Sequence, residues 1–235
     1  MLSKPKHGLF ITGTDTEVGK TYVGSLIVKS LASAGYRVGA YKPVASGCIS
    51  DGRSLFSEDA MALWDATGRN GTTDQVCPQR FKAALAPHLA AQAEGRAIDG
   101  EALRTGIEVW NDQCDIVVVE GVGGLMSPIS ADEYVADLAL DLGYPLVIVV
   151  PNMLGAINQT LQTLITASCF RDGLPIAGIV INDLQDFESD VSVDSNEQQI
   201  ASRTDVPILA RAGYHADALD REVDWFALSS TTAET

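Results

Sequence analysis

The stretch Gly13–Thr21, with the sequence GTDTEVGKT, constrains the fold of this chain more than any other feature. It follows the apolar run Gly8–Ile11 and opens a helical pattern that continues through Leu31. A strand, a glycine loop ending in Gly-Lys-Thr and a helix together are typical of a phosphate-binding loop. Backbone N–H groups of the loop and helix start point at anionic oxygens, and the helix dipole adds partial positive charge. We expect Lys20 to reach the outer phosphates of a nucleotide and the Thr21 hydroxyl to hold Mg²⁺.

The loop departs from the usual spacing of its glycines. Five residues rather than four separate Gly13 from Gly19, and Thr14 stands where the first glycine is expected. The plain alternative is an ordinary strand–turn–helix connection that happens to contain Gly-Lys-Thr. Because strand, loop and helix all agree, we predict a fold of the P-loop NTPase type with a deviant Walker A loop.

Apolar runs of strand length recur along the chain, and several are continuous rather than alternating, as in strands buried on both faces of a parallel sheet. Predicted strands are Leu9–Ile11, Val38–Tyr41, Ile116–Val119, Leu146–Val150, Ile176–Ile181 and Ile208–Leu209. Predicted helices between them are Lys20–Ala34, Asp59–Thr67, Asp99–Asn111, Ser130–Leu142, Asn158–Arg171 and Ser195–Arg203, the fourth because Ser130 and Glu133 have capping-box spacing. The alternation predicts an α/β fold with a doubly wound, mainly parallel sheet. We expect a single domain over residues 1–228 and a disordered tail over residues 229–235.

Composition narrows the classes of function. The chain has 235 residues, of which 46% are hydrophobic, and this is enough for one well-buried core. Its formal charge of −15 argues against nucleic acid and anionic membranes as main partners. The four cysteines form no Cys-x-x-Cys pair, which favours reduced thiols in a cytoplasmic protein over a zinc site. Residues 1–7 have no signal-peptide pattern, and the longest apolar run, Pro145–Pro151, is too short to span a bilayer.

Several motifs, in this order along the chain, resemble those of dethiobiotin synthetases. They are GTDTEVGKT at 13–21, YKPVASG at 41–47, SEDA at 57–60, PHLAAQAEGR at 87–96, VEGVGG at 119–124, LGAIN at 154–158 and IND at 181–183. The resemblance implies an ATP- and Mg²⁺-dependent ligase that acts as a homodimer with shared sites. Such a ligase forms a carbamate from 7,8-diaminononanoate and CO₂ and phosphorylates it with ATP to a carbamic–phosphoric anhydride. It then closes a cyclic urea, giving dethiobiotin, ADP and phosphate.

Two carboxylates are candidate metal ligands beside Thr21. Glu120 follows a predicted strand and precedes a glycine turn, and in open parallel sheets ligands sit at the carboxyl ends of strands. Asp59 lies near a helix start, where the helix dipole alone favours a carboxylate. The resemblance of SEDA to the family segment assigns magnesium binding to Asp59, with Glu58 as its rival. We therefore expect Thr21, Asp59 and Glu120 to hold Mg²⁺.

Lys42 ends the second predicted strand at the same edge of the sheet. Taken alone, it would be a surface lysine in an ion pair. A second cation beside the phosphate loop could instead hold both a carboxyl-type intermediate and the γ-phosphate. The resemblance gives Lys42 the catalytic role, with Lys20 as the second catalytic cation, and makes Ser46 a substrate contact. It also places Thr16 near the substrate amine and Glu17 near nucleotide and substrate.

The remaining candidates concern the nucleotide and a partner subunit. Predicted nucleotide contacts are Glu17, Val18, Gly19, Lys20, Thr21, Asp59, Glu120, Gly121, Gly123, Asn182 and Asp183. Asn182 and Asp183 could be plain turn residues, but the resemblance uses this asparagine to read adenine. Leu154, Gly155 and Asn158 open a helix whose free N–H groups can bind an anion, and in the family this segment of the partner subunit holds the substrate carboxylate. The Arg211–His215 loop departs from the family pattern, so nucleotide preference stays open.

Two other functions are alternatives to the ligase. The first is an ATP-driven partition or positioning switch of the same P-loop class. Such switches carry an early lysine, usually in a Lys-Gly-Gly pattern, and Gly13-Thr14-Asp15-Thr16 has no lysine. The second is an amidase-linked ligase that acts on corrinoid carboxylates. It would need an additional glutaminase domain, for which 235 residues leave no room.

Overall fold

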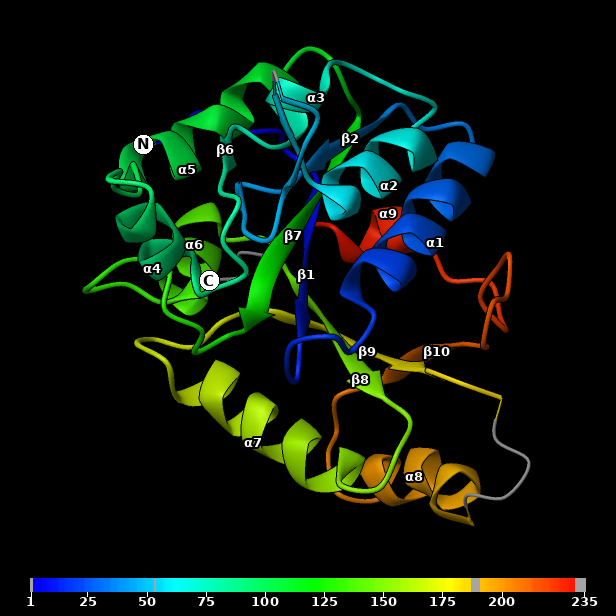
Figure 1. Cartoon of the computed structure of the whole chain (residues 1–235). Helices are drawn as coiled ribbons and strands as arrows, with labels where there is room; N and C mark the ends of the chain where they lie inside the picture. Colours follow the sequence, from blue (N-terminus) through cyan, green and yellow to red (C-terminus); the bar gives the residue numbers. More distant parts are fainter. Residues whose placement is uncertain (1, 53, 187–190, 231–235) are drawn as a thin grey trace.

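A six-stranded parallel sheet forms the centre of the protein, which we describe from a computed structural model that covers residues 2–52, 54–186 and 191–230 (Figure 1). The strand order is β10-β9-β8-β1-β7-β2. The strands are β1 (Gly8–Gly13), β2 (Val38–Tyr41), β7 (Ile116–Gly124), β8 (Leu146–Pro151), β9 (Ile176–Asn182) and β10 (Ile208–Ala212). All neighbouring strands in it run parallel, so the predicted α/β fold with a parallel sheet is confirmed.

Helices cover both faces of the sheet, because successive residues of each buried strand point to opposite faces. Leu9 and Ile11 pack toward α1 (Lys20–Ser33) and α9 (Trp225–Leu228), whereas Phe10 packs toward the other face. The other face is covered by α6 (Val135–Leu142), α7 (Ala156–Cys169) and α8 (Val191–Ala201). In Figure 1, α1 and α9 lie on one side of the strands, and α7 and α8 lie on the other. The sheet is thus doubly wound.

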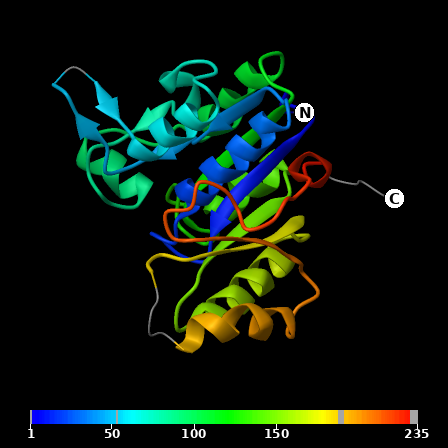
Figure 2. The ribbon, with the colours of Figure 1, turned by 90° about the vertical axis from the view of Figure 1, so that its right-hand side faces the viewer.

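Short elements between β2 and β7 build the rim on one side of the sheet. They are β3 (Val44–Ala45), β4 (Ile49–Ser50), β5 (Leu55–Phe56), α2 (Glu58–Ala66), α3 (Thr73–Val76), β6 (Gln79–Arg80), α4 (Pro87–Ala93), α5 (Gly100–Thr105) and the 3₁₀-helix η1 (Gly106–Trp110). β3 pairs with β6, and β4 pairs with β5 in a hairpin that projects from the body of the protein in Figure 2. Except for α2 and the helix over α5 and η1, the sequence did not predict these elements.

Several predicted element boundaries were wrong by a few residues, among them the start of α6 and the end of β7. Helix α6 begins at Val135 rather than at Ser130, because the Ser130 N–H donates to the Glu133 carbonyl in a turn and the Tyr134 N–H donates to the Asp137 carboxylate. Strand β7 continues past Glu120 to Gly124, because Gly124 pairs with Gly13 of β1 after a register shift, beside Gly123 with its φ of 66°. Glu120 therefore lies within a strand, opposite Ile11, and not at its end.

The C-terminal segment packs against the start of β1. Ser229 is buried, its hydroxyl donates to the Phe226 carbonyl, and its own carbonyl accepts from the Gly8 N–H. The fold therefore reaches beyond residue 228, and residues 231–235 of the expected disordered tail lie outside the described residues. Within the described ranges, no helix has the length and apolar character needed to cross a bilayer. All four cysteines are free thiols.

Candidate active site

The phosphate-binding loop connects β1 to α1 at the carboxyl edge of the sheet (Figure 1). Gly19 has a φ of 87°, and a Cβ there would lie 2.0 Å from the Asn182 amide nitrogen, so only glycine fits. Thr14 N–H donates to the Val149 carbonyl and fastens the loop to β8. Lys20 Nζ donates to the Asp15 carbonyl at 2.9 Å and therefore lies over its own loop. Burial lowers the pKa of Lys20, and the carboxylates of Glu120 and Asp59 counteract that effect.

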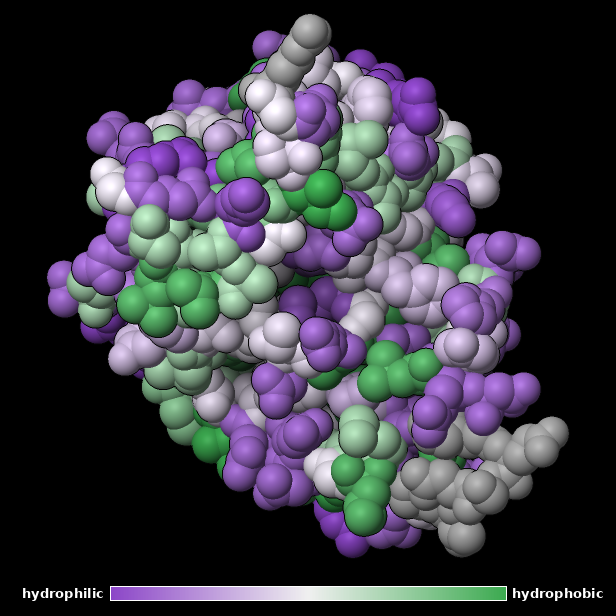
Figure 3. Space-filling view, in the orientation of Figure 1, coloured by the Kyte–Doolittle hydropathy of each residue, from purple (hydrophilic) through white to green (hydrophobic). Residues whose placement is uncertain are grey.

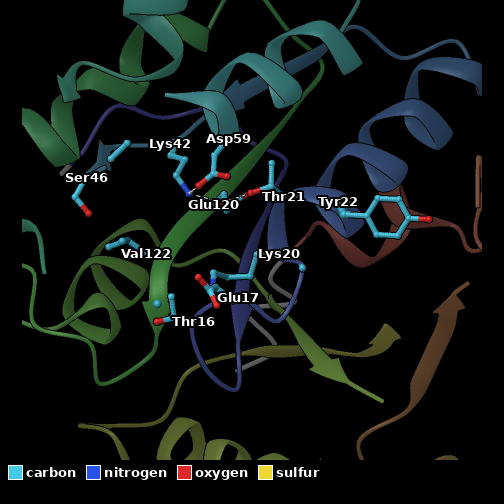
Figure 4. Close-up of a pocket in the computed structure, with 13 residues that line it drawn as sticks. Thr16, Glu17, Lys20, Thr21, Tyr22, Lys42, Ser46, Asp59, Glu120 and Val122 are labelled. Carbon is cyan, nitrogen blue, oxygen red and sulfur yellow. Dashed lines mark hydrogen bonds and ion pairs between the residues drawn. The ribbon is translucent and has the colours of Figure 1, made fainter. Parts of the chain in front are cut away.

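Four side chains from four segments of the chain meet beside this loop (Figure 4). Lys42 Nζ contacts Glu120 Oε1 and lies 2.9 Å from Asp59 Oδ2. The Thr21 hydroxyl donates to the same Glu120 oxygen at 2.9 Å. Lys42 and Glu120 are fully buried, whereas 51% of the Asp59 side chain is exposed. The cluster therefore has a buried floor and one side that opens to solvent.

The fold explains why these residues converge. Lys42 is the first residue after β2, and Glu120 lies in β7, the strand beside it in the sheet. Asp59 lies in the first turn of α2, which is anchored where the Ser57 hydroxyl accepts a hydrogen bond from the Ala60 N–H. β2 pairs with β7 in a register that puts Tyr41 beside Val119, so the next residues, Lys42 and Glu120, become neighbours although they are distant in sequence.

The charges in the cluster determine the state of Lys42. Burial opposes its ammonium form, but the adjacent Glu120 and Asp59 carboxylates more than offset burial and raise the pKa of Lys42. Burial would likewise raise the pKa of Asp59, but the Lys42 ammonium outweighs it and lowers that pKa. Lys42 is therefore a fixed cation near neutral pH and has no free amine for nucleophilic or base chemistry.

The oxygen atoms of this cluster fit a magnesium ion. Thr21 offers a hydroxyl, and Asp59 and Glu120 offer carboxylates, which are the hard ligands that Mg²⁺ prefers. Glu120 Oε2 is buried and has no hydrogen-bond partner among the described residues, so the glutamate keeps coordinating capacity. Nowhere in the described part of the chain do three or more His, Cys, Asp or Glu side chains gather as a metal cage. A metal here would need further oxygens from water or a nucleotide, as Mg²⁺ commonly does.

A cavity of about 440 Å³ opens over this cluster. It is lined by Thr16, Glu17, Gly19, Lys20, Thr21, Tyr22, Lys42, Ala45, Ser46, Asp59, Glu120, Val122 and Gly123. Figure 3 shows a hollow with a hydrophilic lining near the middle of this face. In Figure 4, Ser46 and Thr16 border the side of the cavity away from Tyr22. The structure thus joins the phosphate loop to the segment around Lys42 and Ser46.

Four predicted nucleotide contacts do not line this cavity: Asn182 and Asp183 line a second one, described below, and Val18 and Gly121 line neither. Gly121 is enclosed within β7, where a Cβ would press on Val135 and Phe10. The Val18 side chain lies in the hydrophobic core beneath α1, and its carbonyl accepts a hydrogen bond from Asn182. For both residues only the backbone remains available to a ligand.

A second cavity, of about 260 Å³, adjoins the first and has a mostly apolar lining. It is lined by Gly19, Tyr22, Asn182, Asp183, Leu184, Tyr214 and His215. Gly19 and Tyr22 line both cavities, so a ligand bound at the phosphate loop could extend into the second one. The Tyr22 hydroxyl donates to the Gly213 and Ala216 carbonyls and holds the loop of Tyr214 in place. Tyr22 was not among the site residues predicted from the sequence. Its position directly after Gly-Lys-Thr could have indicated that it lies near the nucleotide.

Leu154, Gly155 and Asn158 line neither cavity. Gly155 precedes α7 with a φ of 98°, and Leu154 beside it is 81% exposed. These residues belong to a different surface of the chain, where they could contact another molecule.

Comparisons with known proteins agree with this geometry. A family profile described as an AAA domain matches residues 7–219. The ATP-dependent dethiobiotin synthetase BioD of Rhodopirellula baltica is 42% identical over 213 residues, covering 86% of this chain and 82% of that protein. The protein of the same name from Akkermansia muciniphila is 37% identical, covering 92% of this chain and 97% of that protein. This chain belongs to the dethiobiotin synthetase family. The resemblance noted from the sequence motifs is thereby confirmed.

Solved structures show the fold of this dethiobiotin synthetase family member at greater distance. A ParA family ATPase from Chlorobium tepidum aligns with a TM-score of 0.52 at 16% identity, covering 91% of this chain and 85% of that one. At such low identity the likeness concerns the fold alone. Together with the parallel sheet and the phosphate loop, it confirms the P-loop NTPase type predicted from the sequence.

Proposed function

We propose that the chain is an ATP- and Mg²⁺-dependent ligase that makes dethiobiotin from 7,8-diaminononanoate and CO₂. The observation that carries the proposal is the shared cavity in which the phosphate loop, Thr16 included, faces Lys42 and Ser46. A nucleotide and a small diamine can meet there without a further domain. Family membership supplies the identity of the substrates, since the relatives are named ATP-dependent dethiobiotin synthetases.

The reaction has three balanced steps. One amine adds to CO₂ and loses a proton, which gives a carbamate. A carbamate oxygen then attacks the γ-phosphorus of ATP, and the bond to ADP breaks. Finally the second amine attacks the carbamate carbon, expels phosphate and loses a proton to the departing phosphate or to water, which closes the cyclic urea. No step needs a protein nucleophile, so the site has to position reactants and neutralise charge.

The residues of the cavity match these needs. Lys20 and the loop N–H groups hold the β- and γ-phosphates, and Lys42 as a fixed ammonium balances charge on the carbamate and on the transferred phosphoryl group. Mg²⁺, held by Thr21, Asp59 and Glu120, would supply further positive charge at the phosphates. Thr16, Glu17 and Ser46 border the cavity where the diamine would lie.

Incubation of the protein with diaminononanoate, bicarbonate, Mg²⁺ and ATP tests the proposal. Dethiobiotin formation, followed by mass spectrometry, should depend on all four components and yield one ADP per product. ATP hydrolysis without any dethiobiotin would contradict the proposed reaction. The rival function, an ATP-driven partition switch, is not favoured by the names of the relatives. This chain also lacks, in Gly13–Thr16, the early lysine that such switches carry.

Exchanging the acids at the start of α2 tests the metal ligand. Asp59→Asn should shift the Mg²⁺ concentration for half-maximal activity upward by about tenfold, because an amide is a poorer ligand than a carboxylate. Glu58→Gln is the matched control on the adjacent residue and should leave the Mg²⁺ titration unchanged. A shift with Glu58→Gln but not with Asp59→Asn would mean that the metal ligand was misassigned.

The protein also acts, in this proposal, as a cytoplasmic homodimer with shared sites. The helix start at Leu154, Gly155 and Asn158 lines neither cavity of its own chain, which supports the family expectation that it serves the substrate carboxylate from a second chain. Its free N–H groups suit a carboxylate. Leu154 and Ile165, on or beside α7, are 81% and 62% exposed, which supports a contact at this surface.

Mixing two inactive variants tests the shared site. Lys42→Ala removes the cation, and Gly155→Pro cannot adopt the φ of 98° that the helix start needs. In a mixed dimer one of the two sites combines intact halves, so random exchange should restore about a quarter of wild-type activity. Each variant alone, shown to be folded by circular dichroism, is the control. No recovery after proven subunit exchange would place the whole site within one chain.

A further inference from the structure

The Asp183 carboxylate at the rim of the second cavity accepts three hydrogen bonds from its neighbours. Arg211 donates to it through two nitrogens, from Nε to Oδ2 at 2.8 Å and from Nη2 to Oδ1 at 2.9 Å. Asn152 Nδ2 donates to Oδ1 at 2.7 Å. Asn196 Nδ2 in turn donates to Asn152 Oδ1 at 3.0 Å and fixes the orientation of that amide. Asn152 and Asn196 are buried, so this network belongs to the packed interior between β8, β9, β10 and α8.

The way Arg211 engages Asp183 has a consequence for base recognition. A guanidinium presents two parallel N–H donors to a carboxylate. Guanine presents a similar pair through its ring N–H and its exocyclic amine. An aspartate at the rim of a base cavity could therefore grip guanine with the same two oxygens that Arg211 occupies here. While the Arg211 pair is intact, Asp183 cannot offer that edge to a base.

Asn182 favours adenine over guanine through a separate contact. It lines the second cavity, is 2% exposed, and donates from Nδ2 to the Val18 carbonyl at 2.9 Å. Its Oδ1 is buried without a hydrogen-bond partner in the part of the chain that the structure describes. An unpaired acceptor favours a base with an amino donor, such as adenine, and disfavours the carbonyl oxygen that guanine has at the same position.

We propose that Arg211 is a specificity-determining residue that makes the second cavity select adenine over guanine by withholding Asp183 from the base. Arg211 acts through Asp183 and is thus a positioning residue. The inference rests on the proposed function only in that the two joined cavities take one nucleotide. It changes the expected role of Asp183, whose carboxylate is held by the protein and does not bind the nucleotide directly.

The affinities of two non-hydrolysable nucleotides, AMPPNP and GMPPNP, test the inference by titration calorimetry with Mg²⁺ present. The wild type should bind AMPPNP about tenfold tighter or more. Arg211→Met frees Asp183 and should lower this preference about tenfold, mainly through tighter GMPPNP binding. The double variant Arg211→Met with Asp183→Asn should lose that gain, because the freed carboxylate is absent.

Arg37→Met is the matched control, because Arg37 makes a similar two-nitrogen pair with Asp115 at an exposed site that lines neither cavity. It should leave the preference unchanged. Equal loss of both nucleotides in Arg211→Met, or an unchanged preference, would overturn the inference and leave Arg211 a structural role. If Arg211→Met does not fold, Arg211→Lys replaces it, since a lysine cannot reproduce the two-donor fork. For Arg211→Lys too, equal loss of both nucleotides or an unchanged preference would overturn the inference.

Binding is measured without the diamine, so the two proposals fail separately. A wild type that prefers AMPPNP but makes no dethiobiotin would sink the proposed reaction and keep this inference. A wild type that makes dethiobiotin but binds both nucleotides equally would support the proposed reaction and overturn this inference.

Discussion

Replacing Lys20 by alanine is expected to lower kcat/KM for dethiobiotin formation by about 100-fold or more. Lys20 lies at the end of the phosphate loop, with its ammonium over the loop and beside the cavity. Loss of one preorganised cation from a phosphoryl-transfer site removes roughly 3 kcal/mol of transition-state stabilisation. Product formation in steady-state kinetics, followed by mass spectrometry, measures the loss.

Lys29→Ala is the matched control for Lys20, because Lys29 lies on the same helix α1 but is exposed and lines no cavity. It should keep wild-type kinetics. Circular dichroism and thermal melting should show that Lys20→Ala is folded. A folded Lys20→Ala variant with near-normal kcat/KM would rule out phosphate binding by this loop.

Replacing Lys42 by methionine should have two separate effects, because Lys42 balances two carboxylates and also faces the reacting groups. Activity should fall by about 100-fold or more, as one fixed cation is lost. Stability without Mg²⁺ should fall by about 2–3 kcal/mol, since Glu120 is left buried without its cation. Thermal melting should register this as a Tm lower by several degrees.

Adding MgCl₂ without nucleotide distinguishes these effects. A divalent ion should raise the Tm of Lys42→Met more than that of the wild type, because in the variant no ammonium occupies Glu120 and Asp59. Lys29→Met, exposed on α1, provides the control for a lysine-to-methionine change. Equal Mg²⁺-induced shifts in the two proteins would show that Lys42 and the metal do not share these carboxylates.

Much of the fold follows from local signals in the chain. All six central strands contain apolar runs at or near their predicted positions, and in the inner strands β1, β7 and β8 the continuous runs reflect burial on both faces. Lys42 and Glu120 could be predicted to share an edge, since each follows such a run. β3 and β6 could not be predicted, because strands of two residues carry no periodicity. The start of α6 was misplaced because Glu133 pairs with Arg104 and does not cap the helix.

The second cavity was beyond prediction for a different reason. Tyr22, Asn182 and Tyr214 meet only because the sheet order brings the phosphate loop close to the ends of β9 and β10. Nothing in the sequence around Arg211 indicates that it pairs with Asp183 across two neighbouring strands. Pairings of this kind depend on strand order, and strand order is poorly determined by a single sequence read alone.

The position of β1 has a consequence for the growing polypeptide. β1 is synthesised before the other five strands of the sheet, yet it lies inside the sheet between β7 and β8. Gly8 pairs with Val117 and Phe10 with Leu146, so its backbone partners do not exist until much of the chain has been translated. Pairing between such distant segments is slow, and the waiting strand is apolar and open to aggregation. The phosphate loop therefore cannot take its folded position until both flanking strands have been made, and the apolar β1 stays unpaired during that interval.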